Sequence, residues 1–156
     1  MRLAIVAVGH KQPDWVRAGC DEYLKRLPRE LAARVVEIKP EPGGSKTRAQ
    51  IQAAEKIRIR QVLGATRQRV IALDEKGRDL TTRQLADALR EWMRTGDDTA
   101  LLIGSAGGLD AELKMEADDL LRLSSLTLPH GLARLLLCEQ IYRAISLLKN
   151  HPYHRE

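Results

Sequence analysis

The chain has 156 residues, of which 44% are hydrophobic and 30% are charged, as is typical of a soluble globular protein. Its 26 lysines and arginines exceed its 21 acidic residues, so the net charge of +5 favours a polyanionic partner only mildly. No apolar run is long enough for a membrane span or a signal-peptide core, which excludes these classes. We therefore expect a cytoplasmic protein that forms a single domain over residues 1–156.

The core is expected to be aliphatic, because the chain has no phenylalanine. Its two cysteines, Cys20 and Cys138, lie far apart in the sequence in apolar surroundings. They form neither a CxxC motif nor a metal-ligand spacing, so we expect reduced thiols in the core and no bound metal.

The first elements are a strand, a helix and a second strand. Arg2–Val8 is an apolar run that predicts a buried strand, closed by Gly9. Pro13 suits the start of a helix, which the apolar spacing extends to about Leu27. Val35–Ile38 predicts the second strand, and the prolines and glycines after it predict a flexible loop.

A second helix is predicted from Thr47 to about Leu63, with Ile51, Ala54 and Ile57 facing inward and Leu63 as a further candidate. Its cations then form an outer face, which we expect to contact phosphates and to make the binding of a polyanionic partner steeply salt-dependent. These cations are Lys46, Arg48, Lys56, Arg58 and Arg60.

The second half of the chain continues the alternation. Arg69–Asp74 predicts a third strand, and a helix capped by Thr81 or Thr82 runs to about Met93, before Gly96. Thr99–Ile103 predicts a fourth strand, and Leu121–Leu128 is expected to contain a fifth. The final helix is predicted from about Leu132 to Leu148.

Near-continuous apolar strands separated by helices predict an α/β fold, with a mostly parallel sheet covered by helices on both faces. Such sheets bind ligands beyond the carboxyl ends of their strands. We therefore expect Leu73, Gly104 and the segment Leu126–His130 to lie at this edge.

Two loops there are candidates for chemistry. The segment Gly104–Gly108 contains three glycines between a strand and a helix-forming stretch that begins at Asp110, but it matches neither GxGxxG nor the P-loop. The segment Leu123–His130 alternates hydroxyls with leucines before Pro129, a composition that suits an adenine ring and a ribose better than a phosphate. An ordinary strand-to-helix turn and an ordinary strand end are the alternatives for the two loops.

The final helix carries Arg143 among many leucines and isoleucines, and its apolar surface is too broad for one stripe. It is therefore either deeply buried or packed on a partner subunit; a membrane-surface helix fits less well, because the helix also carries Glu139. After it comes a tail, 150–156, with side chains that can stack on a base, hold a phosphate and move a proton. A plain polar cap of the helix is the alternative reading of this tail.

Taken together, the chain resembles the RlmH family over essentially its whole length and in order. The most specific parts are the Leu126-Thr-Leu-Pro-His130 block and the tail Asn150-His-Pro-Tyr-His-Arg-Glu156. Further matching segments are Val6–Gly9, Pro13–Val16, Ala72–Asp74, Leu102–Gly104 and Ile141–Ala144.

The resemblance implies a homodimeric SPOUT-class methyltransferase with a C-terminal trefoil knot. It implies S-adenosylmethionine as methyl donor and, as substrate, N3 of a pseudouridine in the large-subunit (23S) ribosomal RNA of the assembled ribosome. The cofactor contacts that it implies are Leu73, Gly104, Leu123, Ser124, Ser125, Leu126, Thr127 and Leu128. Leu73 would lie beside the pocket, Gly104 would leave room for the ligand, and the 123–128 run would supply apolar walls and backbone hydrogen bonds.

The chain departs from the pattern of this family at Ser105-Ala106-Gly107, where relatives commonly carry an acidic triplet such as Gly-Pro-Glu. Asp110 is a candidate to replace that acidic side chain.

For catalysis, N3 must lose its proton to become a good nucleophile. His154 is the leading candidate base, with Arg155 to hold a phosphate or an oxyanion and Tyr153 to stack or donate; His130 and Arg143 are second-rank substrate contacts. Two other functions compete: a non-catalytic basic protein that binds RNA or the ribosome without a cofactor, and a flavodoxin-like nucleotide module, for which phosphate-cradling residues are missing.

Overall fold

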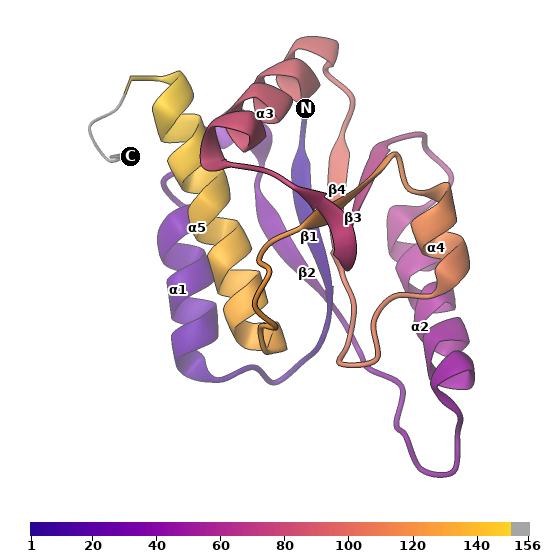
Figure 1. Ribbon diagram of the computed structural model, residues 1–156. Helices are drawn as coiled ribbons and strands as arrows, with labels where there is room; N and C mark the ends of the chain where they lie inside the picture. Colours follow the sequence, from indigo (N-terminus) through magenta and orange to yellow (C-terminus); the bar gives the residue numbers. More distant parts are fainter. Residues whose placement is uncertain (151–156) are drawn as a thin grey trace.

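The computed structural model describes residues 1–150 and contains a five-stranded sheet with helices on both faces (Figure 1). The strand order is β2-β1-β4-β3-β5, and all four neighbouring pairs are parallel. This confirms the predicted α/β class. The trefoil knot stays a prediction from the resemblance, and the tail residues 151–156 lie outside the described residues.

The strands of the sheet are β1 (Leu3–Val8), β2 (Arg34–Ile38), β3 (Arg69–Asp79), β4 (Thr99–Ile103) and β5 (Asp119–Arg122). Every residue of β1 and β4 is buried, because both strands lie inside the sheet and carry helices above and below.

Two strand predictions were wrong. The third strand continues five residues beyond Asp74, because its end resumes pairing with β5 after an irregularity between Leu73 and Arg78. Gly77 makes this possible, since a Cβ there would lie 2.6 Å from the backbone of Leu121. The fifth strand ends at Arg122, so Leu123–Leu128 is a loop and not part of a strand.

The helices are α1 (Asp14–Leu24), α2 (Arg48–Leu63), α3 (Thr82–Thr95), α4 (Ala111–Glu116) and α5 (His130–Leu148), with a short 3-10 turn at Arg29–Leu31. Thr47 and Thr81 each form a capping box with a glutamine three residues later, which defines the starts of α2 and α3. The first helix ends three residues before the predicted Leu27, and α5 begins two residues before Leu132.

The predicted inner face of α2 was partly wrong. Ile57 is 58% exposed, whereas Glu55 and Ile59 are buried. The buried positions follow the four-residue spacing of one helical face, which in this chain includes a glutamate.

Two hydrophobic clusters cover the two faces of the sheet. One joins the sheet to α1, α3 and α5, and the other joins it to α2 and α4 (Figure 1). Helix α5 crosses α1 closely, because a Cβ on Gly19 would lie 2.6 Å from Leu135. Cys20 and Cys138 meet in this buried layer, where the hydrogen bond with Cys20, and then burial, raise the pKa of the Cys138 thiol.

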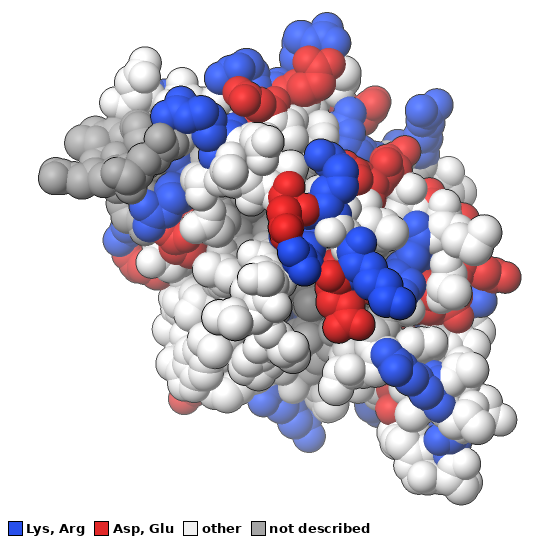
Figure 2. Space-filling model, in the orientation of Figure 1, with Lys and Arg blue, Asp and Glu red and all other residues white. Residues whose placement is uncertain are grey.

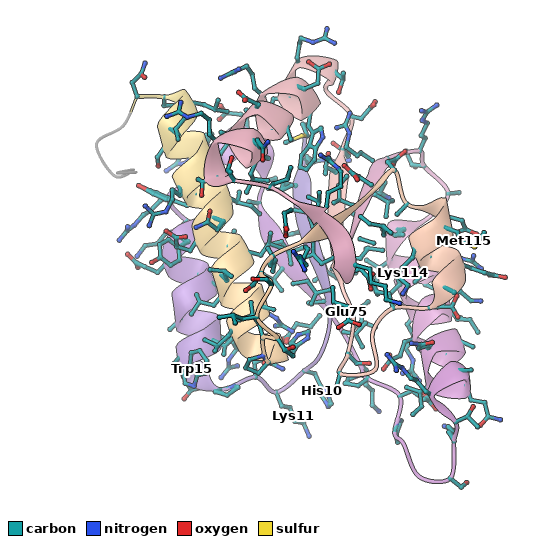
Figure 3. All side chains as sticks on the ribbon, viewed as in Figure 1. His10, Lys11, Trp15, Glu75, Lys114 and Met115 are labelled. Atoms are coloured by element: carbon teal, nitrogen blue, oxygen red, sulfur yellow. The ribbon has the colours of Figure 1, made fainter. Side chains whose placement is uncertain are left out.

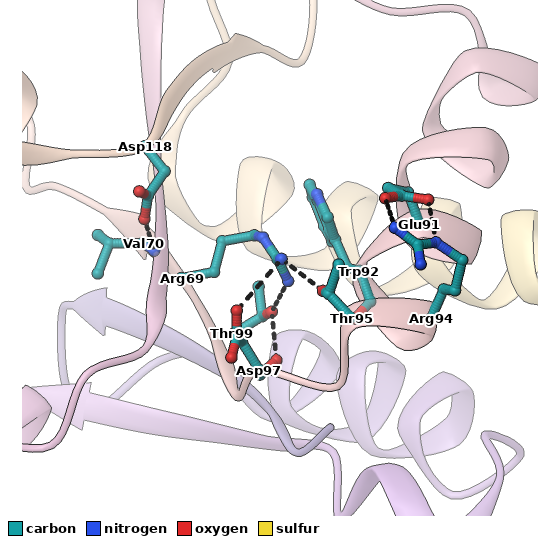
Figure 4. Close-up of polar contacts among 9 residues, drawn as sticks. All are labelled: Arg69, Val70, Glu91, Trp92, Arg94, Thr95, Asp97, Thr99 and Asp118. Carbon is teal, nitrogen blue, oxygen red and sulfur yellow. Dashed lines mark hydrogen bonds and ion pairs between the residues drawn. The ribbon is translucent and has the colours of Figure 1, made fainter.

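The amino edge of the sheet is held by Arg69. Its guanidinium donates to Thr95 (2.8 Å) and Thr99 (3.2 Å) and lies 5.7 Å from the centre of the Trp92 ring (Figure 4). Next to it, the Val70 amide donates to Asp118 at 2.8 Å. These contacts join the starts of β3, β4 and β5 at this edge. Parallel sheets bind ligands at the opposite, carboxyl edge.

Candidate functional site

The loops after β1, β4 and β5 meet at the carboxyl edge of the sheet. The Gly9 amide donates to the Ile38 carbonyl at 2.9 Å, which joins the ends of β1 and β2. Leu73 pairs with Leu121, and the ring of His130 contacts the Gly104 carbonyl at 3.1 Å. The structure therefore brings Leu73, Gly104 and the 123–128 loop to one edge, as the strand pattern predicted.

The loop after β4 is a tight turn that its glycines make possible. The Gly108 amide donates to the Ser105 carbonyl at 2.8 Å, and Gly108 has a φ of +84°, which favours glycine. A Cβ on Gly104 would lie 2.8 Å from the carbonyl carbon of Gly108. Glycine at 104 is thus required by the backbone of the loop itself, in addition to any ligand that the loop holds.

The loop that links β5 to α5 exposes both apolar and polar groups. Leu126 is 75% exposed, while Leu123 packs against the core. The Ser124 hydroxyl accepts a hydrogen bond from the Leu126 amide at 2.9 Å, which folds the loop into a local turn. An exposed leucine next to exposed hydroxyls is the mixture that we expect of a surface completed by a ligand or a partner.

The start of α5 carries a buried polar network. Arg134 is 2% exposed and donates to Glu37 (2.8 Å), to the Gly9 carbonyl (3.3 Å) and to His130 (2.9 Å). A guanidinium can only donate and a carbonyl can only accept, so His130 must carry its proton on Nδ1, toward Gly104. Burial and the Arg134 charge lower the pKa of His130, which agrees with a neutral ring.

A hollow of about 330 Å³ lies on the other side of the Gly104–Gly108 loop, against α2. It is lined by Pro40, Glu41, Arg48, Ile51, Gln52, Glu55, Ser105, Ala106 and Gly107. None of the residues proposed for the cofactor lines it. The hollow is therefore separate from the predicted cofactor contacts.

Glu55 is the acidic group that touches this loop. Its side chain is buried and accepts from the Ser105 hydroxyl (2.8 Å) and from the Glu41 amide (3.0 Å). Asp110, the candidate replacement for an acidic triplet residue, instead caps α4 through the Glu112 amide and lies 3.6 Å from Lys56.

The remaining predicted residues fall in different places. Arg143 lies on α5 and pairs with Glu139 at 2.5 Å, one turn earlier. Tyr153, His154 and Arg155 lie outside the described residues.

Sequence reasoning missed Glu55 and Arg134. Both are charged residues at positions that continue a buried apolar stripe, between Ile51 and Ile59 in α2 and before Cys138 in α5. A charge inside such a stripe was the available signal, because a buried charge requires specific partners.

Within residues 1–150, no cluster of three or more histidine, cysteine or acidic side chains could hold a metal ion. None of the helices in that range combines the length and the apolar character that crossing a bilayer requires.

Comparison with known proteins gives consistent results. The family model described as "Predicted SPOUT methyltransferase" matches residues 1–154. A protein of Dechloromonas aromatica named "Ribosomal RNA large subunit methyltransferase H" is 69% identical over all of this chain and 99% of its own length. A protein of the same name from Burkholderia thailandensis is 56% identical, with 99% of both chains covered.

Among solved structures, a probable methylase family protein from Haemophilus influenzae matches with a TM-score of 0.58. The match covers 99% of this chain and 70% of that one, at 13% sequence identity, and so concerns the fold alone.

Proposed function

We propose that this chain, which belongs to the SPOUT methyltransferase family, transfers a methyl group from S-adenosylmethionine to large-subunit ribosomal RNA. The observation that carries the proposal is the full-length, 69% identical relative named as a ribosomal RNA large subunit methyltransferase. The target that we propose is N3 of a pseudouridine in the 23S RNA of the assembled ribosome, and the place of action is the cytoplasm.

The cofactor would be held between the part of β3 around Leu73, the turn after β4 and the loop before α5. Leu73, Gly104 and the segment Leu123–Leu128 all lie at this edge. Apolar leucine side chains would pack on the adenine ring, and exposed backbone groups would hold its polar atoms. S-adenosylmethionine supplies an electrophilic methyl group, so the protein's main task is to position the acceptor nitrogen and exclude water.

The proposed catalytic groups are in the tail. His154 would remove the N3 proton, Arg155 would hold a phosphate or an oxyanion, and Tyr153 would stack on or donate to the base. Arg143 and His130 are proposed to contact the substrate. For His130 this contact would have to come from its ring edge or face, since both ring nitrogens already have partners.

The decisive experiment is methyl transfer to ribosomes from a strain that lacks this modification. Purified protein and labelled S-adenosylmethionine should place label in the 23S RNA. His154→Ala should lower turnover by roughly 10²–10⁴-fold, as expected for loss of a general base. Within residues 1–150 the last residue that packs on the core is Leu148, and residues 153–156 follow it in the sequence. We therefore expect a chain truncated after Pro152 to keep its fold and its cofactor affinity while losing activity.

A truncated protein that methylates at the full rate would refute the role of the tail, and the mechanism would then have to rest on His130 and Arg143. Wild-type protein that binds ribosomes but shows no affinity for S-adenosylmethionine would instead support a non-catalytic RNA-binding protein.

A further inference from the structure

Glu55 places a carboxylate where the fold otherwise buries apolar groups. The residue is only 3% exposed, and the positions one turn before and after it on α2 are Ile51 and Ile59. Burying a carboxylate lowers stability unless hydrogen bonds compensate. Here the compensation comes from two donors, the Ser105 hydroxyl at 2.8 Å and the Glu41 amide at 3.0 Å.

The same face of α2 also holds the end of the turn after β4. Arg48 and Gln52 both donate to the Gly107 carbonyl at 2.7 Å. With Glu55 they stand at successive turns of the helix, so three side chains of α2 hold residues 105 and 107 by hydrogen bonds. On the other side, His130 contacts the carbonyl of Gly104.

We propose that Glu55 is a positioning residue for S-adenosylmethionine, acting through the Ser105 hydroxyl on the turn that contains Gly104. The proposal rests on the function proposed above. Ser105 supplies the only polar side chain of this turn, since residues 104, 107 and 108 are glycines and residue 106 is an alanine. Holding it in one conformation before the cofactor arrives lowers the entropy lost on binding, which raises affinity.

The test is a double-mutant cycle read by calorimetry of S-adenosylmethionine binding. Ser105→Ala removes the donor to Glu55 and should weaken cofactor binding by about tenfold, the equivalent of one hydrogen bond to a charged group. Ser105→Thr keeps a hydroxyl and should restore most of the affinity. Glu55→Gln keeps the shape and removes the charge, so the effect of Ser105→Ala should be smaller in that background.

Two further measurements separate positioning from folding. Amide exchange of Gly108, which bonds to the Ser105 carbonyl, should become faster in unliganded Ser105→Ala. Ile57→Ala, on the exposed face of the same helix, is the matched control and should leave cofactor affinity unchanged.

Each other outcome overturns the proposal. A lower melting temperature of Ser105→Ala with unchanged affinity would make the contact purely structural. Equal losses from Ser105→Ala in both backgrounds would mean that the hydroxyl touches the cofactor directly. If the wild-type protein binds no S-adenosylmethionine, both the proposed function and this inference are refuted. If the wild type binds it and the variants bind it equally well, only this inference is refuted.

Discussion

At the scale of single residues, His130 joins the start of α5 to the turn that follows β4. Its Nδ1–H points to the Gly104 carbonyl and its Nε2 accepts from Arg134, so a second proton would break the contact with the guanidinium. Burial, then the charge of Arg134, lowers the pKa of His130 below its ordinary value of 6.5. The neutral ring is therefore part of the folded structure.

This predicts a loss of stability in mild acid. As the pH falls below about 6.5, the unfolded chain takes up a proton at His130 while the folded chain does not, so the free energy of unfolding decreases. The loss levels off once the pH passes the lowered folded-state pKa. Urea unfolding at several pH values from about 7 to about 5 measures it.

His130→Gln, which does not titrate, is the control and should show a flatter pH dependence in that window. Glu41 and Glu112 have lowered pKa values, so they stabilise the folded state when ionised. This stabilisation is lost only as the pH falls below their ordinary pKa of 4.5, outside that pH window. Equal slopes for the wild type and the variant would contradict the assignment to His130.

At the scale of elements, α2 is less available to RNA than its sequence suggested. Four of the five cations predicted to form its outer face are paired with carboxylates: Lys46 and Arg58 with Glu41, Lys56 with Glu112, and Arg60 with Glu112 and Glu116. The fifth, Arg48, donates to the Gly107 carbonyl. Figure 2 shows cations and anions interleaved over the part of the surface that includes α4. Paired charges attract phosphates weakly, because the neighbouring anions repel them.

Lys11 and Lys39 are better placed to contact RNA. Both are exposed and follow the ends of β1 and β2 at the edge that carries the proposed site (Figure 3 labels Lys11 beside His10). We predict that replacing both with alanine weakens ribosome binding and lowers the slope of log K against log salt by about one to two. Filter binding at several salt concentrations would measure the slope.

The paired replacement Lys56→Ala with Arg60→Ala is the matched control, since it also removes two positive charges. It should change the slope less. A larger effect of the α2 pair than of the loop pair would restore the original prediction of an RNA-binding face on α2.

At the scale of the whole molecule, a group of exposed apolar residues around the start of α5 points to a second copy of the chain. Eight residues of α5 are buried within one chain, so the helix as a whole does not need a partner. Three large apolar side chains near the start of α5 are exposed: Leu132 in the helix itself (44%), Trp15 of α1 (53%) and Leu126 of the preceding loop (75%). A Cβ on Gly131 would lie 3.9 Å from the Trp15 ring, so α1 contributes to the same surface.

This surface predicts a homodimer centred on the first turn of α5, and not on its full length. Figure 2 shows a broad uncharged area over α1 and the start of α5, and two-fold pairing of such a face is the commonest arrangement. Light scattering at micromolar concentration should return twice the chain mass of 17.5 kDa.

Leu132→Glu should shift the protein to monomer, because pairing would bury its charge, while Met115→Glu on α4 should not. Met115 is 85% exposed and serves as the control for an apolar-to-acidic change elsewhere. A monomer mass for the wild type would exclude the dimer.

Local sequence determined much of this fold. Apolar runs predicted the positions of β1 and β4, since a strand buried on both faces carries mostly apolar side chains. Thr47 and Thr81, each with a glutamine three residues on, defined helix starts through contacts within one turn. The loops at the carboxyl edge followed from parallel strands, whose ends meet on one side.

Only the tertiary structure decided which of these loops touch, and through which side chains. The end of β3 is a strand because β5 pairs with it, and residues 75–79 carry no apolar pattern that would have predicted it. The network of Gly9, Glu37, Gly104, His130 and Arg134 joins residues up to 125 positions apart. In the sequence alone, Glu55 and Arg134 are charges that interrupt apolar stripes. The groups that stabilise these buried charges lie elsewhere in the chain, so only the tertiary structure identifies them.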